Sequence, residues 1–106
     1  MTGKEIADNL RGTKLKWGRR QLASRNGYHC VLGIKGIEHG VTLEQLRKLD
    51  GDVRYSYENW DSTLGQITAM NDSCDTKEEL IAKFEENPDE EYAVELFIEK
   101  AKAVQV

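Results

Sequence analysis

A cysteine between two histidines is the first feature of the chain that could do covalent chemistry: His29, Cys30 and His39. The dipole of a helix N-terminus and a nearby imidazolium would favour the Cys30 thiolate. Sequence neighbours rarely point toward one another, so His39 would be the base, and Asn71 or Asp72 would orient its ring. The alternative is a small buried cysteine, because free cysteine is among the most buried residue types. The pattern favours this alternative.

The same residues, together with Cys74, include the types that ligate zinc. They lack the paired C-x-x-C or H-x₃₋₅-H spacing that is typical of such sites. We therefore expect no metal, and no other cofactor is indicated.

Two further segments could bind an anion. Small polar residues run from Asn71 to Thr76 before an expected helix, where free N–H groups could receive a nucleotide phosphate, with Asn71, Asp72 and Thr76 as contacts. The alternative, which we favour, is that Asn71 and Asp72 tie the interhelical turn to nearby backbone and cap the next helix.

The second segment mixes basic and aromatic residues. It comprises Lys14, Lys16, Arg19, Arg20 and Arg25, with Trp17 and Tyr28 between them. Such a segment could bind nucleic acid through phosphate contacts and stacking, and Arg19 and Arg20 are its ligand-binding candidates. The net charge of −4 disfavours nucleic acid, so a solvated hairpin face with Trp17 buried is the preferred interpretation.

Charge is unevenly distributed along the sequence. Residues 1–35 carry eight basic and two acidic side chains, whereas residues 36–106 carry seven basic and seventeen acidic ones. These halves could pair within the fold, which we favour, or face different partners. The acidic surface of residues 85–95 could dock a basic partner or mimic DNA, although charge runs at helix starts are usually only solvated.

The length and composition of the chain limit the kinds of protein it can be. A chain of 106 residues with 39% hydrophobic and 32% charged residues predicts one soluble domain, 1–106. Its apolar runs are too short for a membrane span or a secretory leader. Two cysteines do not indicate a disulfide framework, so we expect a reduced, cytoplasmic setting.

Capping residues and apolar spacing predict mostly short helices. Thr2 and Glu5 would open the first, ended by Gly12, and a helix is favoured over residues 30–39, ended by Gly40. The other expected helices begin after Thr42, after Asn59 or Asp61, after Thr76 and after Asp89, with an extended piece possible at Val53–Tyr57 in the loop before the fourth.

The Asn26–Gly27 pair separates two runs that could be strands, and it suits the type I′ turn of a hairpin. The expected fold class is therefore α+β and mainly α, with about five short helices and one small N-terminal β-hairpin.

Several short motifs resemble an uncharacterised family of small bacterial and phage-encoded proteins. They are Trp17-Gly18-x-x-Gln21-Leu22, Gly27-Tyr28-x-Cys30-x-Leu32-Gly33, Ile67-x-x-Met70-Asn71-Asp72 and Thr76-x-x-Glu79-Leu80. This chain departs from that family at Ile34, where alanine is usual, and at Met70, where tryptophan is frequent. The resemblance implies a mostly helical fold and a bacterial or phage origin, and it carries no activity.

These observations predict a cytoplasmic, non-enzymatic binding protein, plausibly a phage or mobile-element accessory protein that docks on a host protein. A binder of a nucleotide or small anion is the second hypothesis, and a cysteine-dependent enzyme is the third. No membrane partner is expected.

Overall fold

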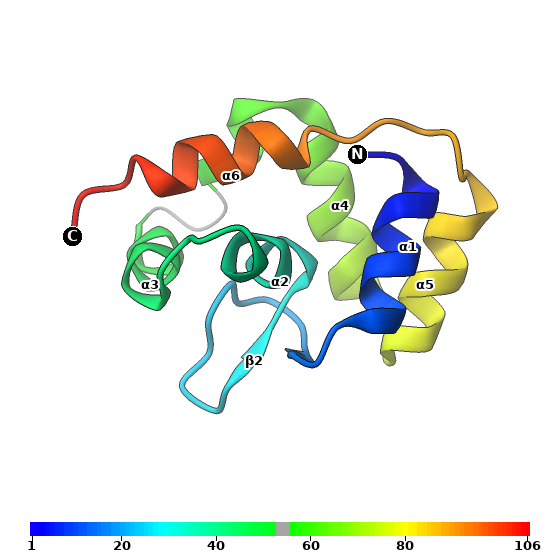
Figure 1. Ribbon diagram of the computed structural model, residues 1–106, viewed down its shortest axis with the longest axis horizontal. Helices are drawn as coiled ribbons and strands as arrows, with labels where there is room; N and C mark the ends of the chain where they lie inside the picture. Colours follow the sequence, from blue (N-terminus) through cyan, green and yellow to red (C-terminus); the bar gives the residue numbers. More distant parts are fainter. Residues whose placement is uncertain (53–55) are drawn as a thin grey trace.

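The computed structural model describes residues 1–52 and 56–106, and it is mainly helical with one small sheet (Figure 1). Two-residue strands, β1 (Lys16–Trp17) and β2 (Tyr28–His29), make the sheet. The helices are α1 (Gly3–Gly12), α2 (Val31–Glu38), α3 (Leu43–Gly51), the 3₁₀-helix η1 (Ser56–Trp60), α4 (Ser62–Ser73), α5 (Lys77–Glu86) and α6 (Val94–Lys102). The predicted mainly helical class is confirmed.

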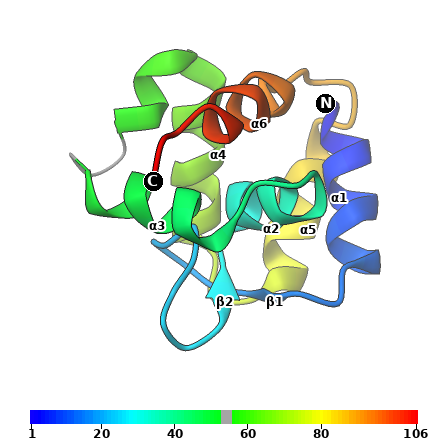
Figure 2. The ribbon, with the colours of Figure 1, turned by 60° about the vertical axis from the view of Figure 1, so that its left-hand side comes forward.

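Helix α2 lies at the centre of the other elements, as two views of the ribbon show (Figures 1 and 2). Every residue from Val31 to Gly36 is buried, as expected for a helix that is covered on all sides. A Cβ atom on Gly33 would lie 2.0 Å from the carbonyl oxygen of Leu22. Glycine is therefore required where the loop before β2 presses against α2.

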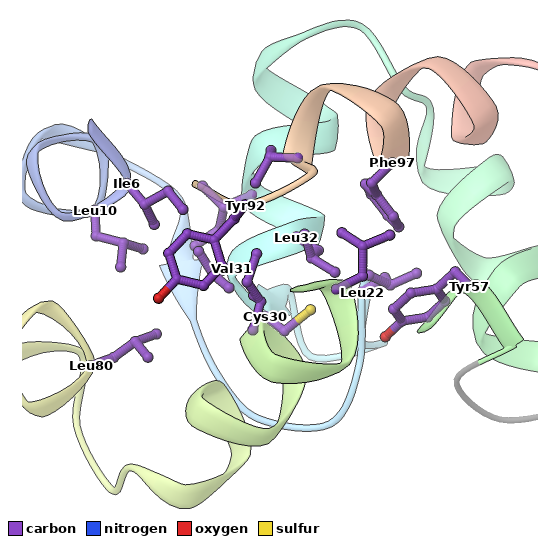
Figure 3. Packing of buried hydrophobic residues seen from close by; sticks show 14 of the residues in the cluster. Ile6, Leu10, Leu22, Cys30, Val31, Leu32, Tyr57, Leu80, Tyr92 and Phe97 are labelled. Atoms are coloured by element: carbon purple, nitrogen blue, oxygen red, sulfur yellow. The ribbon is translucent and has the colours of Figure 1, made fainter. Parts of the chain in front are cut away.

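One cluster of apolar side chains forms the core around α2 (Figure 3). Ile6 and Leu10 from α1 face Leu80 from α5, and Phe97 of α6 meets Tyr57 of η1 in an edge-on ring contact, with centroids 5.4 Å apart. Helices α1 and α5 approach closely at Gly3, where a Cβ atom would lie 2.6 Å from the Phe84 carbonyl oxygen.

Local capping signals predicted most helix starts correctly. Thr2 with Glu5 and Thr42 with Gln45 form reciprocal capping boxes, and the Asp61 side chain caps α4. Thr76 accepts the Glu79 N–H as expected. The box at α5 is not reciprocal, however, because the Glu79 carboxylate accepts the Asp75 N–H instead.

The predicted β-hairpin agrees with the structure only in part. The chain does reverse near Asn26–Gly27, with the Gly27 N–H donating to the Ser24 carbonyl at 3.2 Å. Only Gly27 has a positive φ there, +83°, so the turn is not type I′, which needs two such residues. Strands β1 and β2 pair in parallel, Lys16 with Tyr28, because residues 18–27 form a loop that carries the chain back to start β2 alongside β1.

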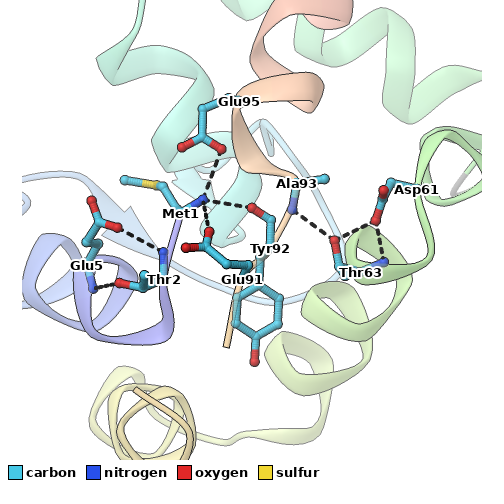
Figure 4. Close-up of polar contacts among 9 residues, drawn as sticks. All are labelled: Met1, Thr2, Glu5, Asp61, Thr63, Glu91, Tyr92, Ala93 and Glu95. Carbon is cyan, nitrogen blue, oxygen red and sulfur yellow. Dashed lines mark hydrogen bonds and ion pairs between the residues drawn. The ribbon is translucent and has the colours of Figure 1, made fainter. Parts of the chain in front are cut away.

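The last helix begins later than predicted, at Val94 instead of after Asp89. Glu91 pairs with Thr2 in an isolated antiparallel bridge, and the Tyr92 N–H donates to the Met1 carbonyl at 2.8 Å. The Ala93 N–H donates to the Thr63 hydroxyl at 2.9 Å (Figure 4). These long-range bonds hold residues 91–93 outside the helix.

The extended segment expected at Val53–Tyr57 can be compared with the structure only at its last two residues. Val53 to Tyr55 lie outside the described residues, and Ser56 and Tyr57 belong to η1 and are not extended. Within the described ranges, no helix combines the length and apolar character needed to cross a membrane.

Candidate functional site

The structure separates the three residues that a cysteine-dependent reaction would need. Cys30 is the N-cap of α2 and His39 is its C-cap. At a rise of 1.5 Å per residue these positions are about 13 Å apart along the helix axis. His39 is exposed, whereas Cys30 is buried with 4% of its surface accessible. No Cys30–His39 pair forms.

Cys30 is held as a thiol. Burial raises the pKa of Cys30 to about 12, although the N–H groups of Gly33 and Leu32 oppose this shift. Its sulfur lies in the apolar cluster beside Val31 and Leu32 (Figure 3). The helix N-terminus thus fails to activate this cysteine, because removal from water outweighs the favourable N–H groups.

The remaining ligand-type side chains are also used structurally. His29 is buried, and its Nδ1 lies 2.8 Å from the Leu22 carbonyl oxygen, to which it donates. Cys74 is fully buried at the end of α4. Among residues 1–52 and 56–106, no group of three or more histidine, cysteine or acidic side chains could hold a metal ion.

Asn71 is a buried structural connector. Its Oδ1 accepts the Trp17 indole N–H at 2.7 Å and the Val31 N–H at 3.0 Å. Its Nδ2 donates to the Gly18 carbonyl and to Asp72 Oδ1, both at 3.2 Å. With no accessible surface, Asn71 cannot contact a ligand, and it instead positions the residues that can.

The two candidate anion-binding segments meet in one open groove of about 800 Å³, which we call the basic groove. It lies between the loop around β1 and the start of α5. Its lining residues are Leu15, Lys16, Trp17, Gly18, Arg19, Arg20, Asn26, Tyr28, Asp75, Thr76 and Lys77. Of the predicted site residues, Arg19, Arg20 and Thr76 therefore lie together in the groove. Asp72 is not among the lining residues, and Asn71 is buried.

Positive charge dominates the basic groove. Of the described residues that line it, four carry basic side chains and one, Asp75, carries a carboxylate. Asp75 Oδ1 lies 3.3 Å from a guanidinium nitrogen of Arg19, with both side chains well exposed. Exposed pairs of this kind contribute little free energy, so Asp75 holds Arg19 only weakly.

Arg20 has an unusual backbone conformation. Its φ is +73°, and it is the only non-glycine residue with a positive φ in the described part of the chain. The Asp72 carboxylate holds it there by accepting the Arg20 N–H at 2.9 Å. Glycine would adopt this conformation more easily than arginine does.

A second carboxylate anchors the loop from the other side. Asp50 accepts the N–H groups of Leu22 and Ala23 at 2.9 and 3.0 Å. Burial raises the pKa of Asp50, and the two N–H donors limit that rise. Together, Asp50 and Asp72 fix the segment that carries both arginines.

A smaller cavity of about 410 Å³ adjoins the basic groove, since Arg19, Arg20 and Tyr28 line both. Both arginines are thus accessible from either hollow. Lys14 and Arg25 are exposed but do not line the groove.

Sequence reasoning missed Lys77, which follows the Thr76 cap as the first residue of α5. The predicted cap at Thr76 could have indicated Lys77, because the residue after a cap lies in the first helical turn. An anion bound at the start of that helix would lie close to it.

Comparisons with protein-family models, with curated proteins and with solved structures find no match for this chain.

Proposed function

We propose that this chain is a non-enzymatic binding protein that docks an acidic segment of a partner protein in the basic groove. The observation that supports this most directly is the convergence of Lys16, Arg19, Arg20 and Lys77 from two distant parts of the sequence on one open groove. Arginine clusters of this kind recognise carboxylate-rich or phosphorylated segments by charge-assisted hydrogen bonds.

The chemistry of the lining favours binding over catalysis. Of the described residues that line the groove, none is a histidine or a cysteine. Trp17 and Tyr28 are half-buried and leave part of their ring surface to the groove. A rigid aromatic surface flanked by arginines is typical of the residues that dominate binding energy at protein interfaces.

The setting proposed for this binding is the bacterial cytoplasm. The resemblance of the Trp17–Gly33 and Ile67–Leu80 motifs to small bacterial and phage-encoded proteins supports an accessory role in a phage or mobile element. The docked segment would then belong to a host protein.

A nucleotide or another small anion is the second candidate ligand. It is favoured by the arrangement of Trp17 and Tyr28, which could stack on a base, beside Thr76 and Lys77 at the start of α5. The open form of the groove suits an extended segment better, because small-molecule sites enclose most of their ligand.

Calorimetric titration with a short polyglutamate peptide, and separately with ATP, tests this function. Arg20→Gly should weaken peptide binding at least tenfold, equivalent to about 1.4 kcal/mol, while the positive φ at this position is kept without strain. Arg25→Gly is the matched control, since Arg25 is exposed in the same loop but does not line the groove.

Equal peptide affinity of the Arg20→Gly and Arg25→Gly variants would contradict the proposed groove. Tight binding of ATP without binding of the peptide would favour the second candidate.

A further inference from the structure

The segment from Glu85 to Glu91, which we call the acidic loop, is the most concentrated charge in the chain. Five of its seven residues are acidic, and every residue in it is exposed. Glu85 pairs with Arg11, and Glu91 lies 3.4 Å from the terminal ammonium group of Met1. Glu86, Asp89 and Glu90 make no ion pair with any residue that the structure describes. Three carboxylates are thus available to a partner.

The acidic loop is held in a defined shape. The Gly3 N–H donates to the Glu90 carbonyl at 2.9 Å, and the Lys4 N–H donates to the Pro88 carbonyl at 3.0 Å. Its far end continues into the bridge between Glu91 and Thr2. A preformed segment loses little conformational entropy when it binds, so its charges can be used efficiently for association.

The acidic loop and the loop around β1, which lines the basic groove, lie at opposite ends of α5 (Figures 1 and 2). Lys77 lines the groove at the first residue of this helix, and the acidic loop begins at its last turn. A helix of ten residues spans about 15 Å. The acidic loop of one molecule therefore cannot enter its own groove, but it can enter that of a second molecule.

We propose that the acidic loop of one copy of this chain docks in the basic groove of another copy, and that this self-association competes with the partner segment. The inference rests on the proposed function, because it names one occupant of the same groove. The charges are complementary: the groove presents four basic side chains against Asp75, and the loop presents Glu86, Asp89 and Glu90.

Such a contact is heterologous, because it joins two different surfaces of the same protein. Head-to-tail contacts of this kind extend into rings or open chains unless one surface is blocked. Occupied grooves within the assembly would be closed to the partner, and only the free groove at an end would accept it.

Sedimentation velocity over a range of protein concentrations and salt tests the self-association. We expect assemblies larger than a dimer at low salt and monomers at high salt, because salt screens contacts between exposed charges. The groove variant Arg19→Glu/Arg20→Glu and the loop variant Glu86→Lys/Asp89→Lys should each be monomeric. The control Glu44→Lys/Glu99→Lys, which changes net charge as the loop variant does at exposed positions elsewhere, should assemble like the parent chain.

Mixing the two monomeric variants gives the decisive result. The groove variant retains an intact loop and the loop variant an intact groove, and their two altered surfaces are again of opposite charge. The mixture should therefore assemble although neither variant assembles alone. A mixture that stays monomeric, or a parent chain that stays monomeric at low salt, would overturn the inference.

Polyglutamate binding separates this inference from the proposed function. If the loop variant binds the peptide but the parent chain does not self-associate, the groove binds acidic segments and only the self-docking is wrong. If the folded loop variant fails to bind the peptide, the proposed function itself is wrong.

Discussion

The indole N–H of Trp17 donates to the side-chain oxygen of Asn71 at 2.7 Å, and that oxygen also accepts the Val31 N–H at the start of α2. One buried amide thus joins an aromatic residue of the basic groove to the central helix. The position of the groove and the stability of the core depend on the same side chain.

Replacement of Asn71 by alanine should destabilise the protein by about 2–4 kcal/mol, because it leaves the buried Val31 N–H and the partly buried Trp17 indole N–H without an acceptor. Urea unfolding measures this change. Gln66→Ala on the exposed side of the same helix is the control and should change stability by less than about 0.5 kcal/mol. Comparable losses in the two variants would contradict the connector role of Asn71.

Gly33 and Gly12 offer a matched comparison of glycine in helices. Gly33→Ala should cost more than about 2 kcal/mol or prevent folding, since its methyl group would meet the Leu22 carbonyl oxygen at 2.0 Å. Gly12→Ala should be neutral or stabilising by up to about 1 kcal/mol, because nothing lies within 4 Å of the added carbon. Thermal melting of both variants checks this, and a tolerated Gly33→Ala would exclude the tight contact between α2 and the loop.

The sequence correctly predicted those structural features that depend only on residues close together in the chain. The caps at Thr2, Thr42 and Thr76 follow from side chains within one helical turn. The burial of Cys30 was also predicted, because free cysteine is among the most buried residue types.

Features that depend on distant residues could not be predicted from the sequence. The parallel pairing of β1 and β2 requires Asp50 and Asp72 to hold the intervening loop. The late start of α6 requires bonds from Met1 and Thr63. Lys77 joins Arg19 in the groove only because Asn71 brings the two segments together.

The hydroxyl of Thr63 links the cap of α4 to the start of α6 (Figure 4). It donates to Asp61 Oδ1 at 2.6 Å and accepts the Ala93 N–H at 2.9 Å. Thr63→Val should lower stability by about 1–2 kcal/mol, whereas Thr63→Ser, which keeps the hydroxyl, should lower it by less.

The same substitution should move the titration of Asp61. The hydrogen bond from the Thr63 side chain, followed by that from its backbone, lowers the pKa of Asp61. In Thr63→Val the Asp61 pKa should therefore rise toward its ordinary value, while Thr63→Ser should leave it low. Carboxyl-carbon NMR titration measures both, and an unchanged pKa in Thr63→Val would show that the hydroxyl does not stabilise the carboxylate.

The buried thiol of Cys30 should make the protein less stable in alkali. Its pKa is about 12 in the folded chain, against an ordinary value of 9.0. The folded state therefore retains a proton that the unfolded state releases, and the stability due to this difference is complete below pH 9 and is lost as the pH rises toward 12. The slope is about 1.4 kcal/mol per pH unit for one such group.

Urea unfolding of the parent chain and of Cys30→Ala at pH 7 and at about pH 10.5 isolates this effect, because lysines and tyrosines titrate alike in both proteins. The alanine variant should be less stable than the parent at pH 7, since a buried side chain has been shortened. The difference between the two proteins should shrink by about 2 kcal/mol at the higher pH. An equal stability difference at the two pH values would mean that Cys30 ionises as readily in the folded state as in the unfolded one. That result would favour an accessible, reactive Cys30 over a buried one.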